Sequence, residues 1–316
     1  MNMQYVHGVP DAHPLPSGAL ATFLAVHHAG TISGAASRLH LSQPAVSRRL
    51  QALERQIGVD VFDRVQGRLH LTDAGRALLP HAERSRAAEI DAVRAATDRR
   101  DPLAGTVALG VVGSLVELYV TDAFTAAIRR HPAIEIEVTT ATSSQIRDLV
   151  RRGDVELGVS YAQPIDDDLD VEVIALERLL VVCAADCLVA GGRLAVDELG
   201  HHRWLVFPER ACHPETSGTI ALRTLERHHV APNRLRPIDS LSAQRSLAIA
   251  GYGLALLPAS MVTADLRAGR LATVEVEALV IEAPITLIRR TGAHVGPAAR
   301  MMIELLRSGA GRRGDH

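Results

Sequence analysis

A short polar segment in the first quarter of the chain carries residue types that can read the edges of DNA bases. Its members are Ser42, Gln43, Pro44, Ala45, Ser47 and Arg48. In the major groove the amide of Gln43 can bond adenine, and the guanidinium of Arg48 can bond guanine. Pro44 and Ala45 are small enough to touch a thymine methyl group. The segment therefore predicts a surface that recognises duplex DNA.

Three amphipathic stretches would hold this segment in a three-helix head. Ser17, Ser33 and Ser42 are the expected N-cap residues, because their hydroxyls can accept bonds from first-turn N–H groups. Pro44 suits the first turn of the third helix and Gly58 suits its end. The expected inward positions are Leu20, Phe23, Leu24 and His27, then Ala35, Ala36 and Leu39, then Val46, Leu50, Leu53 and Ile57. Two short helices, the second with a polar N-terminal face, are typical of a helix-turn-helix, in which Ser33 and Ser42 can also hold phosphates.

The residues after this head predict a two-stranded wing. Val61–Arg64 and Leu69–Leu71 flank a turn at Gln66-Gly67. Arg64 and Arg68 would then lie near the DNA backbone or the minor groove. The alternative interpretation is a helical domain with an ordinary solvated face.

Charge is distributed unevenly along the chain. Residues 31–70 hold six arginines against three acids, and the first 100 residues carry a net charge of +3. The remainder carries −5, so the whole chain is at −2, which excludes a globally basic coat. A basic head on an acidic body is typical of a nucleic-acid-binding module joined to another function. Aromatic residues make up 3%, which argues against stacking of single-stranded nucleic acid.

A long helix is expected after the wing. Thr72 can cap a stretch that runs to about Arg99, a length of roughly 40 Å, and Pro80 should kink or weaken it. Its apolar residues are too small and too few to be covered by the head alone: Leu78, Leu79, Ala82, Ala88, Ile90, Ala92 and Val93. A partner helix would cover them, which predicts a dimerisation helix, and packing on the body of the same chain is the alternative. Asp101–Gly105 then has the composition of a hinge.

From Thr106 onward, predicted strands and helices alternate. The strands of the first block are expected at Val107–Val112, Ile134–Val138 and Leu157–Ser160, and a second such block follows from Leu179. This order predicts an α/β fold in two lobes, with a parallel sheet covered by helices on both faces. A ligand would bind between the lobes, at strand carboxyl ends. Ser114 is expected to cap the helix after the first strand and Ser143 lies before another helix, and such N-termini favour an anion.

Residues 20–80 resemble the LysR-type transcriptional regulators. The resemblance is carried by Phe23, Ala25-Val26, Gly30, Ala35-Ala36, Leu39, Leu41 to Ser47, Leu53-Glu54, Ile57-Gly58, Phe62-Asp63-Arg64 and Leu71 to Gly75. Ala250 to Pro258 is similar to the turn and strand of the family's second lobe, so the resemblance covers nearly the whole chain after Pro16. The chain departs from the family pattern in its N-terminal extension, at Pro80, and at Ile32, where the family often has an aromatic residue.

The resemblance implies a winged helix-turn-helix head, a linker helix that forms a dimer, and a periplasmic-binding-protein-like effector domain. The implied boundaries are 1–16 for a flexible extension, 17–71 for the head, 72–100 for the linker helix, 105–174 with 275–308 for lobe I, 175–274 for lobe II and 309–316 for the tail. The implied partners are double-stranded DNA with an interrupted palindrome near promoters, a small effector that is often an anion, further copies of the chain in dimers and tetramers, and RNA polymerase.

By position, the resemblance also assigns roles to single residues. The family's base-reading residues correspond to Gln43, Pro44, Ala45 and Arg48, and its wing contact corresponds to Arg64. Ser114 and Ser143 match hydroxyl positions of the effector cleft, and Cys212, followed by His213, falls where a loop lines that cleft. Cys212 also aligns with the peroxidatic cysteine of peroxide-sensing members, but position 221, where they have a resolving cysteine, is Ala. A pocket-lining thiol is therefore favoured over a redox switch.

Two alternatives would give a different function or body. Cys212-His213 could suggest a thiol enzyme, but sequence neighbours rarely orient toward each other, and neither an oxyanion loop nor a Gly-rich phosphate loop is apparent. The same head could also be joined to a different C-terminal domain, as in molybdate-responsive regulators, but the two-lobe pattern of strands and helices argues against this. Three cysteines favour a reducing cytosol, no apolar run is long enough to span a membrane, and no metal or cofactor is expected. We therefore expect a cytoplasmic regulator that is not an enzyme.

Overall fold

The computed structural model of this protein describes residues 15–97, 105–161, 167–189, 191–208, 217–279 and 281–310. The chain divides between Ile90 and Asp91 into two units, each with its own hydrophobic core. Most of the expected N-terminal extension, residues 101–104 of the expected hinge and most of the expected tail lie outside the described residues.

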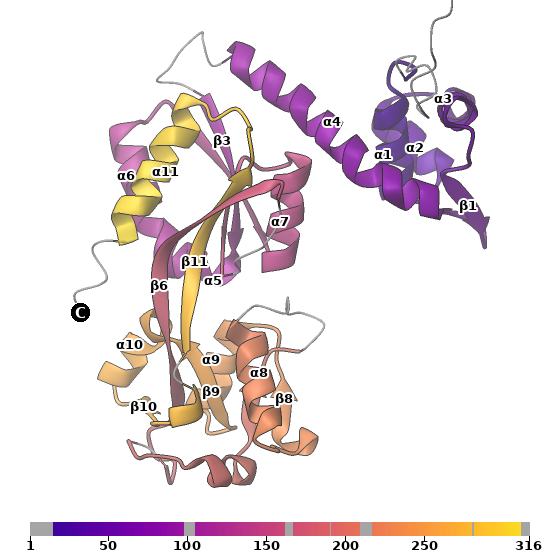
Figure 1. Ribbon diagram of the computed structural model, residues 1–316. Helices are drawn as coiled ribbons and strands as arrows, with labels where there is room; N and C mark the ends of the chain where they lie inside the picture. Colours follow the sequence, from indigo (N-terminus) through magenta and orange to yellow (C-terminus); the bar gives the residue numbers. More distant parts are fainter. Residues whose placement is uncertain are drawn as a thin grey trace, which may run out of the picture. The chain divides into compact units, whose positions relative to one another are not determined.

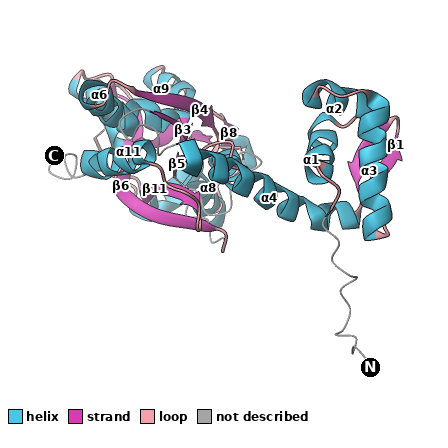
Figure 2. Cartoon of the chain, turned by 90° about the horizontal axis from the view of Figure 1, so that it is seen from above, coloured by secondary structure: helices cyan, strands magenta, loops and turns pink. Residues whose placement is uncertain are grey.

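The first unit opens with the three predicted helices, α1 (Ala19–Ala29), α2 (Ile32–Leu39) and α3 (Gln43–Ile57) (Figure 2). Their core includes Phe23, Val26, Ala35, Val46 and Leu53, all fully buried. Helix α1 ends at Gly30 and, as expected, α3 ends at Gly58, both in the left-handed region that favours glycine. Ile57, expected inward, is instead 36% exposed, because it is the last residue of its helix.

Two of the three predicted helix caps are wrong. Gly18, not Ser17, occupies the N-cap of α1, and no side chain caps that helix. Thr31, not Ser33, caps α2, where its Oγ1 accepts a bond from the N–H of Gly34 at 3.1 Å. The chain leaves the left-handed Gly30 and is extended at Thr31, so the helix begins before it reaches Ser33. The cap of α3 is confirmed, since Ser42 Oγ accepts from the N–H of Ala45 at 3.4 Å.

The predicted wing is confirmed as an antiparallel pair, β1 (Phe62–Val65) and β2 (Arg68–Leu71). The turn residues Gln66 and Gly67 both have positive φ, as a tight two-residue hairpin requires. The N–H of Leu69 donates to the carbonyl of Gly30 at 2.9 Å. This bond holds the wing against the turn between α1 and α2.

Helix α4 (Asp73–Thr97) follows the wing and runs through Pro80 without a break. Thr72 caps it as expected, since its Oγ1 accepts from the N–H of Gly75 at 3.0 Å. A Cβ on Gly75 would lie 2.2 Å from the carbonyl oxygen of Val61, so only glycine allows the helix to start this close to the wing. The helix end expected at Arg99 falls outside the described residues.

The apolar side of α4 is covered in part by the head. Leu78, Leu79 and Ala82 pack against the core of the first unit, which differs from the expectation that a partner helix covers them. Val93, in the second half of the same helix, is 64% exposed. The need for a separate cover is therefore confined to the second half of the helix.

The second unit is built on one nine-stranded mixed sheet (Figure 1). Its strands are β3 (Gly105–Val112), β4 (Ile134–Ala141), β5 (Leu157–Ser160), β6 (Leu169–Ala184), β7 (Trp204–Val206), β8 (Leu235–Pro237), β9 (Leu254–Pro258), β10 (Leu271–Thr273) and β11 (Ile281–Arg290). The order is β4-β3-β5-β11-β6-β9-β7-β8, with β10 beside β6. The prediction of a parallel sheet is therefore only partly right. Strands β3–β5 are mutually parallel, as are β7–β9, but β6 and β11 run antiparallel to their neighbours.

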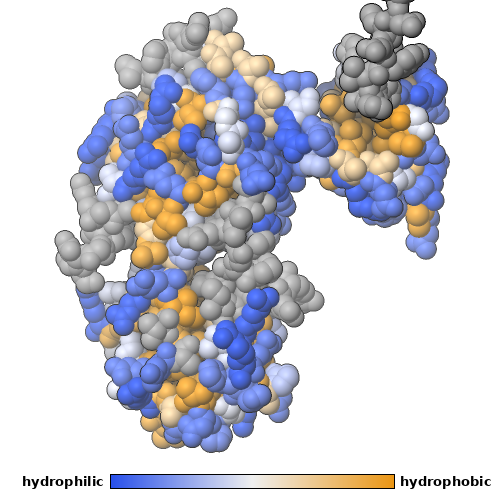
Figure 3. Space-filling view, in the orientation of Figure 1, coloured by the Kyte–Doolittle hydropathy of each residue, from blue (hydrophilic) through white to orange (hydrophobic). Residues whose placement is uncertain are grey.

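Strands β6 and β11 connect the two halves of this sheet. They pair with each other from Leu169↔Arg290 to Leu179↔Ile281, and Figure 1 shows both crossing from one half to the other. The space-filling view shows apolar residues gathered over this crossing, where Leu176 is 64% exposed (Figure 3). We call the half with β3–β5 lobe I and the half with β7–β10 lobe II.

Helices cover both lobes. Lobe I carries α5 (Gly113–Leu115), a π-helical stretch (Val116–Val120), α6 (Thr121–Arg130), α7 (Ser143–Arg152) and α11 (Pro297–Ala310). Lobe II carries α8 (Ser217–Arg227), α9 (Leu241–Ile249) and α10 (Ala259–Arg267), with short 3-10 turns at Val196–His201, Pro232–Arg234 and Glu277–Leu279. No helix in the described part of the chain is long and apolar enough to cross a membrane.

A buried carboxylate fastens the helices of lobe II. Asp265 of α10 has a fully buried side chain, and it accepts bonds from Arg245 of α9 and from Arg270, whose Nε lies at 2.8 Å. These bonds, that from Arg245 above all, hold the pKa of the Asp265 carboxyl below its usual value. Because the folded pKa is lowered, the stabilisation is present at neutral pH and is lost as the pH falls through the folded pKa.

We predict that Asp265→Asn lowers the free energy of unfolding at pH 7 by about 3 kcal/mol, because it leaves two guanidinium groups without their buried partner. Urea denaturation at pH 7 measures this, and the difference from the wild type should shrink in acid. The control is Glu277→Gln. It breaks an exposed pair with Arg193 and should cost less than about 1 kcal/mol. Equal losses in the two variants would contradict the role assigned to Asp265.

Candidate functional site

The polar segment of the head lies on the exposed side of α3. Gln43, Pro44 and Arg48 are exposed in its first two turns, while Val46 and Leu50 are buried on the opposite side. Ala45 and Ser47 are half-buried between them, and Ser42 is the N-cap. The helix therefore presents its amide and guanidinium groups to solvent on a rigid base.

The structure brings Gln43 and Ser33 together. The Nε2 of Gln43 donates to the Oγ of exposed Ser33 at 3.4 Å, which joins the N-terminal turns of α2 and α3. On the wing, Arg64 of β1 and Arg68 of β2 are both exposed. All the residues predicted to contact DNA therefore lie where solvent or a ligand can reach them.

A cavity of about 510 Å³ opens between the lobes of the second unit. It lies at the carboxyl ends of the parallel strands, as expected for an open α/β sheet. From lobe I it is lined by the ends of β3 and β4 and by Tyr161, which follows β5. From lobe II it is lined by β7, by the end of β9 and by Asp239, which lies two residues after β8. Most of the lining is apolar, and Asp239 is the only charged side chain among its described residues.

Both predicted lobe I hydroxyls line this cavity. Ser143, expected just before a helix, is the first residue of α7, and Thr142 is the N-cap. Ser114, expected to cap a helix, instead lies inside the short α5, whose N-cap is Val112 and carries no side-chain bond. The prediction of a cap at Ser114 was wrong because the chain enters its helix directly at Gly113, one residue before the hydroxyl.

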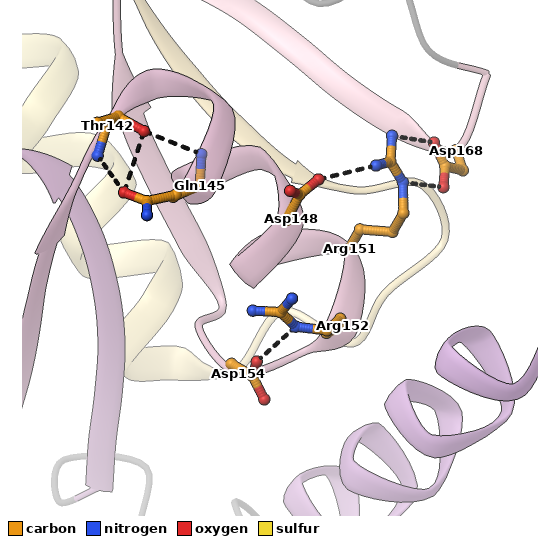
Figure 4. Close-up of polar contacts among 7 residues, drawn as sticks. All are labelled: Thr142, Gln145, Asp148, Arg151, Arg152, Asp154 and Asp168. Atoms are coloured by element: carbon orange, nitrogen blue, oxygen red, sulfur yellow. Dashed lines mark hydrogen bonds and ion pairs between the residues drawn. The ribbon is translucent and has the colours of Figure 1, made fainter. Parts of the chain in front are cut away.

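A capping box fixes the start of α7 (Figure 4). Thr142 Oγ1 accepts from the N–H of Gln145 at 3.4 Å, and Gln145 Oε1 accepts from the N–H of Thr142 at 3.0 Å. The N–H groups of Ser143 and Ser144, in the first turn, have no acceptor within the helix. The positive end of the helix dipole therefore faces the cavity beside the Ser143 hydroxyl.

Ion pairs hold the other end of α7. Arg151 Nε donates to Asp168 at 2.8 Å, and Arg151 also approaches Asp148 one turn earlier (Figure 4). Arg152 donates to Asp154 at 2.9 Å. Positive side chains at this end suit the helix dipole, so the same contacts orient the helix and its N-terminus.

Two hydroxyls at the lobe I wall are buried without hydrogen-bond partners. Ser114 Oγ and the hydroxyl of Tyr161 make no hydrogen bond of normal geometry within the described residues. Tyr161 follows β5, is 8% exposed and lines the cavity. Burial raises the pKa of Tyr161, an effect that the nearby Ser114 partly offsets, so the phenol stays protonated. A ligand with a hydrogen-bond acceptor would satisfy both groups.

The lobe II wall has most of its polar groups already paired. The indole N–H of Trp204 donates to the carbonyl of Leu199 at 2.9 Å, so Trp204 offers the cavity only its ring. Gln244 donates to the carbonyl of Ile238 at 2.8 Å, and Ser240 caps α9. Asp239, beside that cap, is exposed and has no ion pair within the described residues.

Sequence reasoning missed Tyr161, Trp204 and Asp239. Tyr161 could have been found, because it follows the buried run Leu157–Ser160 and so falls at the same sheet edge as the two serines. Trp204 and Asp239 depend on the folding of lobe II. Cys212 and His213, predicted to line the cleft, lie outside the described residues. Within those residues no group of three His, Cys, Asp or Glu side chains could hold a metal ion.

Two family models match the chain. The model "Bacterial regulatory helix-turn-helix protein, lysR family" matches residues 18–76, and "LysR substrate binding domain" matches residues 100–311. The two matches cover the head and the second unit respectively.

Similar proteins include two regulators named CbbR. That of Rhodospirillum rubrum is 29% identical over 282 residues, which are 89% of this chain and 92% of the relative. That of Xanthobacter flavus is 30% identical over 286 residues, 89% of this chain and 84% of the relative. A full-length OxyR variant from Pseudomonas aeruginosa is similar in structure, with a TM-score of 0.67, 20% identity, and coverage of 94% of this chain and 95% of that one.

We predict that Tyr161→Phe stabilises the ligand-free protein by about 1 kcal/mol, because it removes a buried hydroxyl that has no partner. The matched control is Tyr119→Phe. The hydroxyl of Tyr119 is also buried but donates to the carbonyl of Leu306 at 2.7 Å, so its loss should destabilise the protein by about 1 kcal/mol. Denaturant unfolding measures both, and a destabilised Tyr161→Phe protein would show that its hydroxyl is satisfied.

Proposed function

The chain belongs to the LysR family of DNA-binding transcriptional regulators, and from this premise we propose that α3 reads a specific site while the interlobe cavity binds a small anionic effector. The family consists of regulators with an effector-binding domain and not of enzymes. One observation carries the proposal: the same chain has an exposed polar face on α3 and a cavity in which the buried hydroxyls of Ser114 and Tyr161 have no hydrogen-bond partner.

On DNA, we assign base reading to the start of α3. Gln43 and Arg48 would bond base edges, with Pro44 and Ala45 against thymine methyl groups. Ser33, Ser42 and Ser47 would contact phosphates together with the helix N-termini. Arg64 and Arg68 of the wing would bind the backbone or the minor groove. Support comes from the exposure of these side chains above a buried core.

We also propose that residues 72–100 form the linker and dimerisation helix, with the domain boundaries implied by the family resemblance. The exposure of Val93 in the second half of α4 supports a partner helix there. Dimers would pair into tetramers on an interrupted palindrome near a promoter, in the cytoplasm, where RNA polymerase is a further partner. A symmetric site matches a symmetric dimer.

In the cavity, we propose that the anionic group of the effector binds Ser114, Ser143 and the first-turn N–H groups of α7. Helix N-termini are ready sites for anions. The unpartnered hydroxyl of Tyr161 supports the same position, because an anion can accept its bond. We place Cys212 and His213 at this cleft on the family resemblance alone, Cys212 as a lining thiol.

For DNA binding we predict that Arg48→Ala weakens specific binding by about 1–3 kcal/mol and relaxes the base preference at one position. The assay is footprinting upstream of the protein's own gene and its divergent neighbour, at physiological salt with competitor DNA. The control Arg64→Ala should weaken binding to all sequences and lower the slope of affinity against salt by about one charge. Full specificity in Arg48→Ala would mean that α3 is not the reading helix.

For effector binding we predict that Ser114→Ala and Ser143→Ala each reduce the thermal shift produced by a carboxylate that stabilises the wild type. The loss follows from the removal of one hydrogen bond to a charged group in each case. Ser308→Ala is the control. Its hydroxyl bonds the carbonyl of Leu305, away from the cavity, so it should bind like the wild type. If both cleft variants kept every shift, the anion would have to bind elsewhere.

A further inference from the structure

The two walls of the interlobe cavity differ in electrostatic character. The lobe I wall offers hydrogen-bond donors: the hydroxyls of Ser114 and Tyr161 and the N-terminus of α7. The lobe II wall also carries a helix N-terminus, that of α9 with Ser240 and Ser242, but it adds a charge that lobe I lacks, the Asp239 carboxylate. No arginine or histidine is among the described residues that line the cavity. A ligand that spans the cavity therefore meets donors on both sides, but a carboxylate acceptor only on the lobe II side of the described lining.

This asymmetry limits the second polar group of the ligand. A second carboxylate facing Asp239 would be repelled, and no described cation of the lining could neutralise the pair. An uncharged apolar end of the ligand would make no favourable interaction with the carboxylate of Asp239. An ammonium group would be attracted and could donate charge-assisted hydrogen bonds. The apolar side chains of the lining, Trp204 and Leu179 among them, suit an apolar body.

We propose that the effector is an amino acid or a similar zwitterion with an apolar body, its carboxylate on lobe I and its ammonium group on Asp239. This inference rests on the proposed function, because it assumes that the effector occupies this cavity. Asp239 is then the specificity-determining residue, and Tyr161 holds the carboxylate. The carboxylate of Asp239 also lies beside the N-terminus of α9, where it would stabilise the helix, so the test must separate selectivity from stability.

The probes are three acids of one length that differ only at the far end: hexanoate, hexanedioate and 6-aminohexanoate. Leucine and 4-methylpentanoate form a second pair, which places the amino group beside the carboxylate. Calorimetry and thermal shift use the full-length protein. We expect one of the two amino compounds to bind about tenfold more tightly than its amine-free partner, and hexanedioate to bind most weakly.

Two variants make the assignment specific. Asp239→Asn should reduce the preference for the ammonium group to about twofold or less and should improve the relative binding of hexanedioate. Tyr161→Phe should weaken all the acids to a similar degree, because it acts on the carboxylate. Asp197→Asn is the control for net charge, since Asp197 is exposed and is not part of the cavity lining; it should leave the order of binding unchanged.

Several results would overturn the inference. They are equal binding of amino and amine-free partners, tighter binding of hexanedioate, no binding by either amino compound, or an ammonium preference that survives in Asp239→Asn. A loss of stability in Asp239→Asn with unchanged selectivity would assign the carboxylate to α9 alone. A different result would contradict the proposed function itself: carboxylates that bind the Ser114→Ala and Ser143→Ala variants as tightly as the wild type.

Discussion

The antiparallel pairing of β6 with β11 is the constraint on which the ligand cavity depends. On one side β11 pairs with β5, which carries the parallel strands of lobe I, and on the other β6 pairs with β9, which carries those of lobe II. The carboxyl ends of both groups consequently line one cavity. The register between β6 and β11 shifts at Ile285/Thr286, next to Pro284, which cannot donate to the ladder. Such irregularities bend a strand and interrupt its ladder, and this one lies within the connection between the lobes.

The head could be predicted from sequence because local chemistry fixes its elements. Gly30 and Gly58 end their helices in the left-handed conformation, which glycine adopts without steric cost. The turn at Gln66-Gly67 closes a hairpin whose strands are only four residues each. Prediction failed where two local signals competed. Thr31 and Ser33 can both cap a helix, and the backbone conformation after Gly30 decided for Thr31, which the sequence alone does not reveal.

For the second unit the sequence predicts the α/β fold class, but not the strand pairing that connects the two lobes. The buried strands β3 and β5 are continuous apolar runs, which sequence reasoning finds easily. The first ten residues of β6 mix charged residues, such as exposed Glu172, with apolar ones that are not all buried, and only the apolar end of the strand was predicted. What makes the rest a strand is its pairing with β11, more than a hundred residues away. Asp239 follows β8, which joins the sheet through its pairing with β7, so the lobe II wall could not be derived from local pattern either.

A helix N-terminus with polar side chains occurs in both units, at α3 and at α7, and its surroundings determine how it can interact with a ligand. In the head, α3 presents its N-terminal turn and polar side chains to water, which satisfies them until a partner replaces it. In the second unit, α7 presents its N-terminus to a cavity where the hydroxyls of Ser114 and Tyr161 are buried and unsatisfied. Binding at the first site, as proposed, would exchange one set of hydrogen bonds for another, so its specificity would come from geometry. Binding at the second would relieve a cost that the free protein bears, so the ligand would also stabilise the lobe arrangement that encloses it. A small ligand can therefore bias the arrangement of the lobes, provided that it bonds both walls of the cavity at once.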